Sequence, residues 1–247
     1  MTVLVAIPYY GVPELVGRAV RSVLEQTHRD LVCLVIGDGE DPPLSGELAD
    51  PRLRLWRLRR NRGTYFALQL ALLASPHRWF APHAADDWTD PGHLEQLLAV
   101  AGADGDAVIT GAVWWEQGGR PATIHEARYE VGLFTRERLL SIGGYNPDER
   151  MGQDSLLIRL LDATGPLRAT HAPTYHRVRR PGSLTTATET GLRSRARRAM
   201  RRRNRGVLSE SLRLRKPAKI AAFRSSLVPG PLARELEREA RRLRAVL

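Results

Sequence analysis

The sequence has little cysteine and no long apolar run. One cysteine, Cys33, occurs among 247 residues, which excludes a disulfide within the chain and a zinc site built from several cysteines. No segment approaches the roughly 20 apolar residues that span a bilayer, and the N-terminus lacks the basic stretch and apolar core of a signal peptide. We therefore expect a soluble, cytoplasmic protein in which Cys33 is buried.

Acidic residues are fewer than basic ones. The chain has 27 Asp and Glu against 38 Lys and Arg, a net charge of +11. Much of the excess lies in 193–205, where eight of thirteen residues are arginine. Such a block attracts phosphate on nucleic acid, lipid, an acidic partner or a sugar nucleotide, although a solvated helix face is the alternative.

Short apolar runs alternate with amphipathic segments in the first half of the chain. Because strands that alternate with helices form parallel sheets covered on both faces, we expect an α/β fold. The expected strands are 3–7, 31–36, 52–58, 79–82 and 107–115, and the expected helices are 14–27, 64–74, 93–101, 136–141 and 155–163. After residue 183 we expect helices only, the last over 231–247.

Polar residues follow three of the expected strands and precede one expected helix. Tyr10 follows the first strand, Asp38 the second, Arg62 precedes a helix, and Asp86-Asp87 follow the strand over 79–82. Ligands of parallel sheets bind at the carboxyl ends of the strands. Carboxylates there suit Mg²⁺ or Mn²⁺ bound together with a phosphate. An Asp-Asp pair alone also fits a helix cap or a solvated turn.

The order and spacing of these motifs over residues 2–186 resemble the family 2 glycosyltransferases of the GT-A fold. That fold is Rossmann-like, with a mainly parallel central sheet and helices on both faces. The segments that carry the resemblance are 5–10 (VAIPYY), 21–27 (RSVLEQT), 35–39 (VIGDG), 60–63 (RNRG), 85–88 (ADDW), 142–145 (IGGY) and 152–154 (GQD).

The resemblance implies a role for each matching residue. Asp154 is the catalytic base, Asp87 and His176 bind Mn²⁺ or Mg²⁺, and the activity is metal-dependent transfer of a sugar, most simply from a UDP-linked donor. A single in-line displacement then inverts the anomeric carbon, because no carboxylate nucleophile for a double displacement stands out. The implied donor-nucleotide contacts are Pro8, Tyr10, Asp38, Asn61, Arg62 and Asp86.

Three positions depart from the family pattern. Gly37 stands where an acidic doublet is usual, Ala84 replaces an acid that often begins the metal motif, and Gln153 replaces a common Glu. These departures affect metal affinity and the charge around Asp154.

Further contacts are expected after the proposed base. In related enzymes a loop here folds over the pyrophosphate, which makes Arg177 and Arg180 candidate phosphate or acceptor contacts. Trp115 is a candidate for stacking on a sugar or acceptor ring, since aromatic faces offer a large amphipathic contact. His83, His93 and His125 have no evident partner, and ordinary surface or core roles are expected for them.

We expect a GT-A domain over 1–186 and a basic helical extension over 187–247. The extension is predicted to dock an anionic acceptor carrier linked to a lipid, polysaccharide or protein, with at most peripheral membrane contact. Polysaccharide, glycoconjugate and natural-product synthesis all remain open at this point.

Other functions fit the sequence less well. A basic nucleic-acid-binding α/β protein without catalysis accounts for the arginine block, but strand-end acids would repel a phosphate backbone. A dinucleotide enzyme needs a third glycine that 37–39 lacks. A serine hydrolase needs a Gly-x-Ser-x-Gly elbow that the sequence does not contain.

Overall fold

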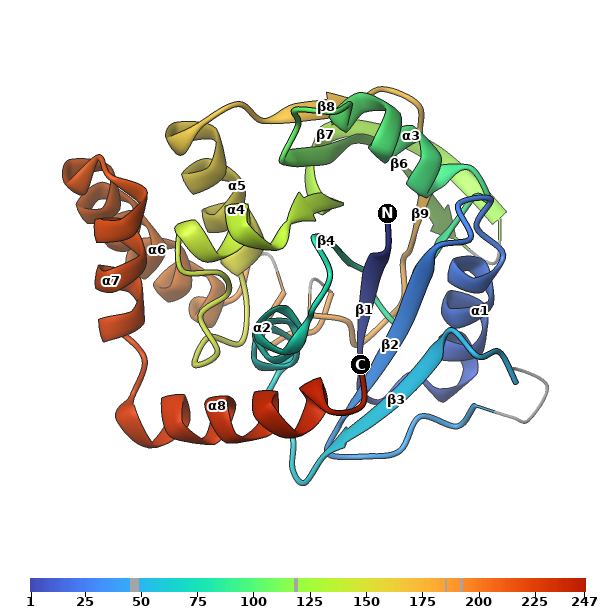
Figure 1. The fold of residues 1–247 in the computed structure, drawn as a ribbon, viewed down its shortest axis with the longest axis horizontal. Helices are drawn as coiled ribbons and strands as arrows, with labels where there is room; N and C mark the ends of the chain where they lie inside the picture. Colours follow the sequence, from blue (N-terminus) through green and yellow to red (C-terminus); the bar gives the residue numbers. More distant parts are fainter. Residues whose placement is uncertain (45–48, 118–119, 185, 192) are drawn as a thin grey trace.

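A twisted sheet with helices on both faces forms the centre of the molecule (Figure 1). The computed structural model describes residues 1–44, 49–117, 120–184, 186–191 and 193–247. Its strands are β1 Val3–Tyr9, β2 Leu31–Asp38, β3 Leu53–Leu58, β4 Trp79–Pro82, β5 Trp88–Thr89, β6 Ala107–Gln117, β7 Arg120–Thr135, β8 Arg168–Thr170 and β9 Tyr175–Val178. Its helices are α1 Pro13–Leu24, α2 Thr64–Ala74, α3 His93–Ala101, α4 Arg136–Ser141, α5 Gln153–Thr164, α6 Arg195–Leu214, α7 Pro217–Ser226 and α8 Gly230–Arg244.

The sheet is parallel in its first half and mixed in its second. Within the described ranges the strand order is β3-β2-β1-β4-β7-β6-β9-β5, with β8 beside β6. The first four strands pair in parallel, whereas β7 is antiparallel to both β4 and β6. The α/β class and the expected strands are confirmed. The long strand β7 was not expected, and Tyr175–Val178 forms strand β9 where a loop was expected.

The strand sequences explain the two-faced core. Alternating residues of β1 point to opposite sides, so Leu4 and Ala6 join one apolar cluster while Val3, Val5 and Ile7 join another. The first cluster includes α2, which is apolar on nearly every side and correspondingly buried. The second includes α1 and α3. Because both faces are covered, β1 and β2 are continuous apolar runs.

The C-terminal helices share the core of the sheet domain. Ile220 of α7 and Leu236 and Leu243 of α8 belong to the same apolar cluster as α2. Figure 1 shows α8 running beside α2, with α6 and α7 beside α4 and α5. The helical character expected after residue 183 is confirmed, and the domain boundary after residue 186 stays a prediction.

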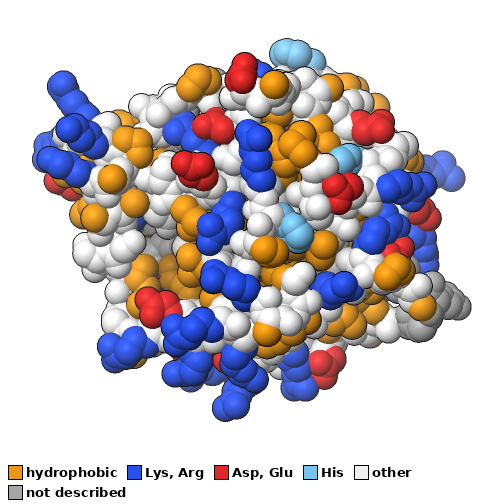
Figure 2. All heavy atoms as spheres, in the orientation of Figure 1, with side chains coloured by type: hydrophobic (Ala, Val, Ile, Leu, Met, Phe, Trp, Pro, Cys, Tyr) orange, Lys and Arg blue, Asp and Glu red, His pale blue; other side chains and the backbone are white. Residues whose placement is uncertain are grey.

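Basic side chains are prominent on the surface of these helices. Figure 2 shows Lys and Arg gathered along the lower edge of the molecule, where α8 runs. Exposed arginines of α8 include Arg234, Arg238 and Arg241. In the part of the chain that the structure describes, no helix has the length and apolarity that crossing a membrane requires.

Candidate active site

Asp38, at the end of β2, binds the start of α2. Its carboxylate accepts hydrogen bonds from the backbone N–H groups of Arg62, at 2.5 Å, and Gly63, at 2.7 Å. Gly63 has φ +93°, a conformation that favours glycine. Burial raises the pKa of Asp38, and the two N–H bonds oppose that shift. Asp38 therefore fixes the loop that carries Asn61 and Arg62, and its contact with a nucleotide base stays a prediction.

The loop over 61–63 is held by residues from later in the sequence. Arg62 forms an ion pair with Glu235 of α8, with Nε of Arg62 at 2.9 Å from the carboxylate. The side-chain oxygen of Asn61 accepts a hydrogen bond from Arg150 at 2.6 Å. Arg62 is thus paired with a carboxylate in this structure, and its phosphate contact stays a prediction.

Asp86 and Asp87 follow β4 and lie against β9. Asp87 is buried, and its two oxygens accept hydrogen bonds from the Tyr175 hydroxyl at 3.0 Å and the Val178 N–H at 2.9 Å. Burial, with the adjacent Asp86 charge, raises the pKa of Asp87 to about 7. Asp86 accepts a hydrogen bond from Nε of Arg180 at 2.8 Å. Asp86 and Asp87 are therefore both held by residues of 175–180, and their convergence with Asp38 stays a prediction.

The oxygen chemistry of this pair fits a hard divalent cation. The hydrogen-bond donors to buried Asp87 are neutral, whereas Asp86 is paired with Arg180. Carboxylate oxygens are the ligands that suit Mg²⁺ or Mn²⁺. Among the described residues no group of three or more His, Cys, Asp or Glu converges on one point. A cation here would depend on Asp86 and Asp87, together with ligands supplied by the substrate.

His176 lies in β9 within a stack of planar groups. Its ring packs on Trp88 with centroids 3.6 Å apart, Trp114 lies beyond it at 6.4 Å, and the Arg18 guanidinium covers the other face of Trp88 at 4.3 Å. Nε2 of His176 is 2.9 Å from Asp90, while buried Nδ1 has no hydrogen-bond partner among the atoms described. His176 is buried in a strand, and its role as a metal ligand stays a prediction.

The remaining histidines separate into core and cleft. His83 and His93 are buried and pack on the Tyr175 ring, so core roles fit both. Burial lowers their pKa values, to about 4 for His83 and about 3 for His93. His125 instead lies exposed on β7 with its edge toward Trp115. Because no strand was expected over 120–135, the sequence did not indicate that His125 lies beside Trp115.

Asp154 lies in the first turn of α5. The helix begins after Gly152, whose φ of +76° is left-handed, and a Cβ there would meet the Met200 side chain at 2.3 Å. The Asp154 carboxylate accepts a hydrogen bond from the N–H of Ser155 at 2.7 Å. The side chain is half-buried and lines a cleft.

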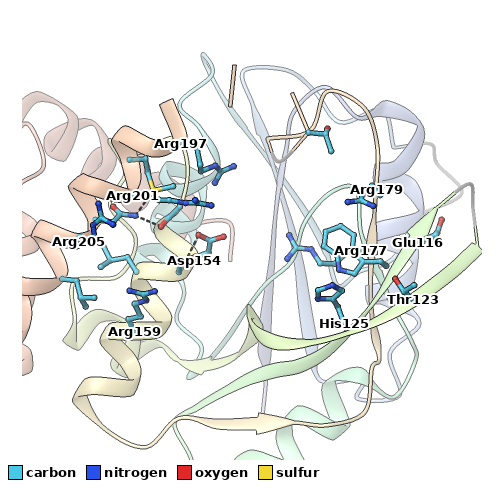
Figure 3. A pocket seen from close by; sticks show the side chains of 18 residues that line it. Glu116, Thr123, His125, Asp154, Arg159, Arg177, Arg179, Arg197, Arg201 and Arg205 are labelled. Atoms are coloured by element: carbon cyan, nitrogen blue, oxygen red, sulfur yellow. Dashed lines mark hydrogen bonds between the residues drawn. The ribbon is translucent and has the colours of Figure 1, made fainter. Parts of the chain in front are cut away.

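This cleft, of about 730 Å³, lies between two walls (Figure 3). One wall comes from α5 and α6 and carries Asp154, Arg159 and Arg201. The other comes from β6, β7 and β9 and carries His125 and Arg177. The full lining is Trp115, Glu116, Thr123, His125, Gly152, Asp154, Ser155, Leu156, Arg159, Arg177, Arg179, Thr186, Arg197, Met200, Arg201, Asn204, Arg205 and Leu208.

The cleft collects some of the predicted residues and not others. Asp154, Trp115 and Arg177 line it, whereas Asp38, Asp86 and Asp87 do not, nor do Pro8, Tyr10, Asn61, Arg62, His176 and Arg180. Arg177 connects the two regions, because it lines the cleft and its charge lowers the pKa of Asp87. Tyr10, 59% exposed, lies on the surface after β1.

Arg159, Arg201 and Arg205 are cleft residues that the sequence did not single out individually. The block over 193–205 was a signal for the latter two, but sequence alone does not show that α6 packs on α5. Arg159 lies five positions after Asp154 in α5, and nothing in its spacing marks it.

Known proteins resemble this chain in sequence and in fold. Residues 4–172 match the family model described as glycosyl transferase family 2. A stretch of 99 residues is 32% identical to the succinoglycan biosynthesis protein ExoO of Rhizobium meliloti (strain 1021), covering 39% of this chain and 28% of that protein.

The fold resembles crystal structures of S. aureus TarS. TarS 1–349 in complex with UDP-GlcNAc has a TM-score of 0.60 at 14% identity, covering 74% of this chain and 60% of that one. The complex with UDP has a TM-score of 0.58 at 14% identity, covering 73% and 61%. This chain thus spans less than two thirds of the length of these proteins. At this identity the likeness establishes the fold, and the expected GT-A architecture is confirmed.

The family model covers more than half of the chain, including the motifs at the ends of β1, β2 and β4 and the start of α5. On this match the chain belongs to glycosyl transferase family 2.

Proposed function

We propose that this glycosyltransferase moves a sugar from a UDP-linked donor to a hydroxyl or amine acceptor, with inversion at the anomeric carbon. The products would be polysaccharides, other glycoconjugates or decorated natural products. The observation that carries the proposal is the position of Asp154, whose carboxylate lines a cleft across from Arg177, and the charge of Arg177 acts on Asp87. The UDP-GlcNAc and UDP complexes of TarS support a UDP-linked donor.

Asp154 is the proposed general base. It is half-buried, its carboxylate is positioned by the Ser155 N–H, and it faces a cleft large enough for an acceptor. In this proposal it takes the proton of the acceptor hydroxyl or amine as that atom attacks the anomeric carbon from the side opposite the leaving diphosphate. Trp115 offers an aromatic face to the acceptor ring, in the same cleft.

The donor would bind at the strand ends beside the cleft. Pro8, Tyr10 and Asp38 are the proposed contacts to the nucleoside, and Asn61 and Arg62 the proposed contacts nearer the phosphates. Asp86 and Asp87 would hold Mn²⁺ or Mg²⁺, with His176 as a further proposed ligand. When bound, such an ion offsets the negative charge that develops on the leaving diphosphate.

Arginines supply fixed positive charge to the same region. Arg177 lies close enough to Asp87 to lower the pKa of that carboxyl, and Arg180 donates to Asp86. Positioned donors of this kind stabilise developing negative charge without reorganisation at the moment of reaction. Both arginines are proposed phosphate contacts.

A panel of nucleotide sugars tests this proposal. UDP-, dTDP- and GDP-sugars are added to the protein with and without Mn²⁺, and the melting temperature is measured. We expect a rise with UDP-sugars that needs Mn²⁺. If no nucleotide sugar raises the melting temperature in either condition, the proposed donor is wrong.

Asp154→Asn separates binding from chemistry. We expect the variant to keep donor-dependent stabilisation and to lose transfer, because the amide does not accept the proton. Asp162→Asn, an exposed carboxylate on the same helix outside the cleft, is the matched control and should keep both. Turnover by Asp154→Asn at the rate of the control would remove Asp154 from the base role.

A further inference from the structure

Three arginines that line the cleft have no counter-charge among the described residues. Arg159 of α5 and Arg201 and Arg205 of α6 are exposed, and none has an ion pair or side-chain hydrogen bond with any residue that the structure describes. Two other arginines of α6 differ in this respect. Arg197 is buried and donates to two backbone carbonyls, and Arg203 pairs with a glutamate. Arg159, Arg201 and Arg205 are therefore not held by an ion pair or side-chain hydrogen bond with a described residue.

These arginines share one wall with Asp154. Arg201 and Arg205 lie four residues apart on α6, which places them on the same helix face about 6 Å apart along its axis. Arg159 is brought beside them because α5 packs against α6. Figure 3 shows Arg159, Arg201 and Arg205 around Asp154, with Arg177 and Arg179 on the wall opposite.

The acids of the cleft do not balance this charge. Six arginines and two acids line it. One acid, Glu116, already accepts from Arg18 at 2.8 Å and from the Trp88 ring N–H at 2.6 Å. The other acid, Asp154, lies on the same wall as the three arginines. Guanidinium groups held together without counter-ions repel one another and attract anions, and their planar fork binds phosphate through paired hydrogen bonds.

We infer that the acceptor of this enzyme carries phosphate groups, which bind Arg159, Arg201 and Arg205 while the acceptor's nucleophile faces Asp154. This inference rests on the proposed function and adds the chemical class of its acceptor. The spacing along α6 suits an acceptor chain with successive phosphates. The proposed donor carboxylates, Asp86 and Asp87, lie outside the lining of the cleft, and Arg177 lines the cleft while its charge acts on Asp87.

Paired double variants on one helix test the inference. Arg201→Gln/Arg205→Gln removes two charges inside the cleft. Arg195→Gln/Arg202→Gln removes two from the same helix outside it, at exposed arginines that lack a side-chain partner in the described segments. The probe is a short fluorescent inorganic polyphosphate chain, with a neutral maltooligosaccharide as the uncharged control. Circular dichroism and melting temperature confirm that both variants fold.

We expect the cleft variant to bind polyphosphate at least tenfold more weakly than the parent, with a shallower dependence of affinity on salt. The control variant should stay within threefold of the parent. Equal weakening in both variants would overturn the inference, because attraction would then come from the whole helix. Unchanged binding in the cleft variant would also overturn it.

Two further measurements separate the alternatives. The first is binding of the parent and both variants to phosphatidylglycerol vesicles. If the control variant loses as much vesicle binding as the cleft variant, the helix faces a membrane and the inference is overturned. Release of sugar from a UDP-sugar into water tests the proposed function independently of any acceptor. If the protein released no sugar from UDP-sugars and only the cleft variant bound polyphosphate more weakly, the proposed donor would be wrong, whereas the anion site would be supported.

Discussion

Replacing Leu243 by alanine tests whether the C-terminal helices are part of the catalytic core. Leu243 of α8 is fully buried in the apolar cluster that includes α2. Removing three carbons loses about 2.4 kcal/mol of transfer free energy, at about 0.8 kcal/mol each. The cavity left behind adds roughly 1 kcal/mol. We therefore expect the free energy of unfolding to fall by about 3 kcal/mol.

Urea denaturation measures this loss, followed by tryptophan fluorescence and by far-ultraviolet circular dichroism. The two transitions should coincide in parent and variant if α8 unfolds together with the sheet. Leu212→Ala on α6 is the matched control, because Leu212 is 44% exposed and should cost less than about 1 kcal/mol. A loss below 1 kcal/mol for Leu243→Ala, or an early separate transition in the helical signal, would refute the shared core and favour an independent unit over 187–247.

Three other perturbations have defined outcomes. Burial lowers the pKa of His93 to about 3, so between pH 6.5 and pH 3 the imidazole is protonated in the unfolded chain and neutral in the folded one. His93 alone should therefore make the protein about 2 kcal/mol less stable at pH 5 than at pH 8. In urea titrations, His93→Gln should reduce this dependence of stability on pH. Glu235→Gln leaves Arg62 without its carboxylate partner, so UDP affinity measured by calorimetry should rise if Arg62 binds phosphate, and an unchanged or weaker affinity would count against that role. Gly152→Ala forces a Cβ to within 2.3 Å of the Met200 side chain at a left-handed position, and should lower the melting point at a cost of about 1–3 kcal/mol, whereas an unchanged melting point would show that the turn relaxes freely.

The parts of the fold that sequence predicted are those with a local signal. The runs that became β1 and β2 are uninterrupted apolar segments, and α1 has its apolar stripe beside a proline in the first turn. The strand β7 has no such signal, because its pairing with β6 shifts register at several points and its residues 123–126 are exposed. The four residues of β9 form a strand only through pairing with β6 and β5, which the local sequence does not encode.

The same distinction applies to the site. Asp87 was predicted because it follows an expected strand, and Asp154 because 152–154 matches a motif of the family that the sequence resembles. The partners of Asp87, which are Tyr175 and Val178, come from β9 and are 88 and 91 residues away in sequence. The cationic wall of the cleft forms only when α6 packs on α5, so its arginines were visible in the sequence as a charged block without a location.

The solitary thiol of this chain is useful for spectroscopy. Cys33 lies fully buried in the middle of β2, and burial raises its pKa far above the usual range, so the reactive thiolate is scarcely populated at neutral pH. A cysteine introduced at an exposed position would therefore be the one site to accept a maleimide dye in the folded protein. Reporter groups for cleft occupancy can be attached without first mutating the native residue.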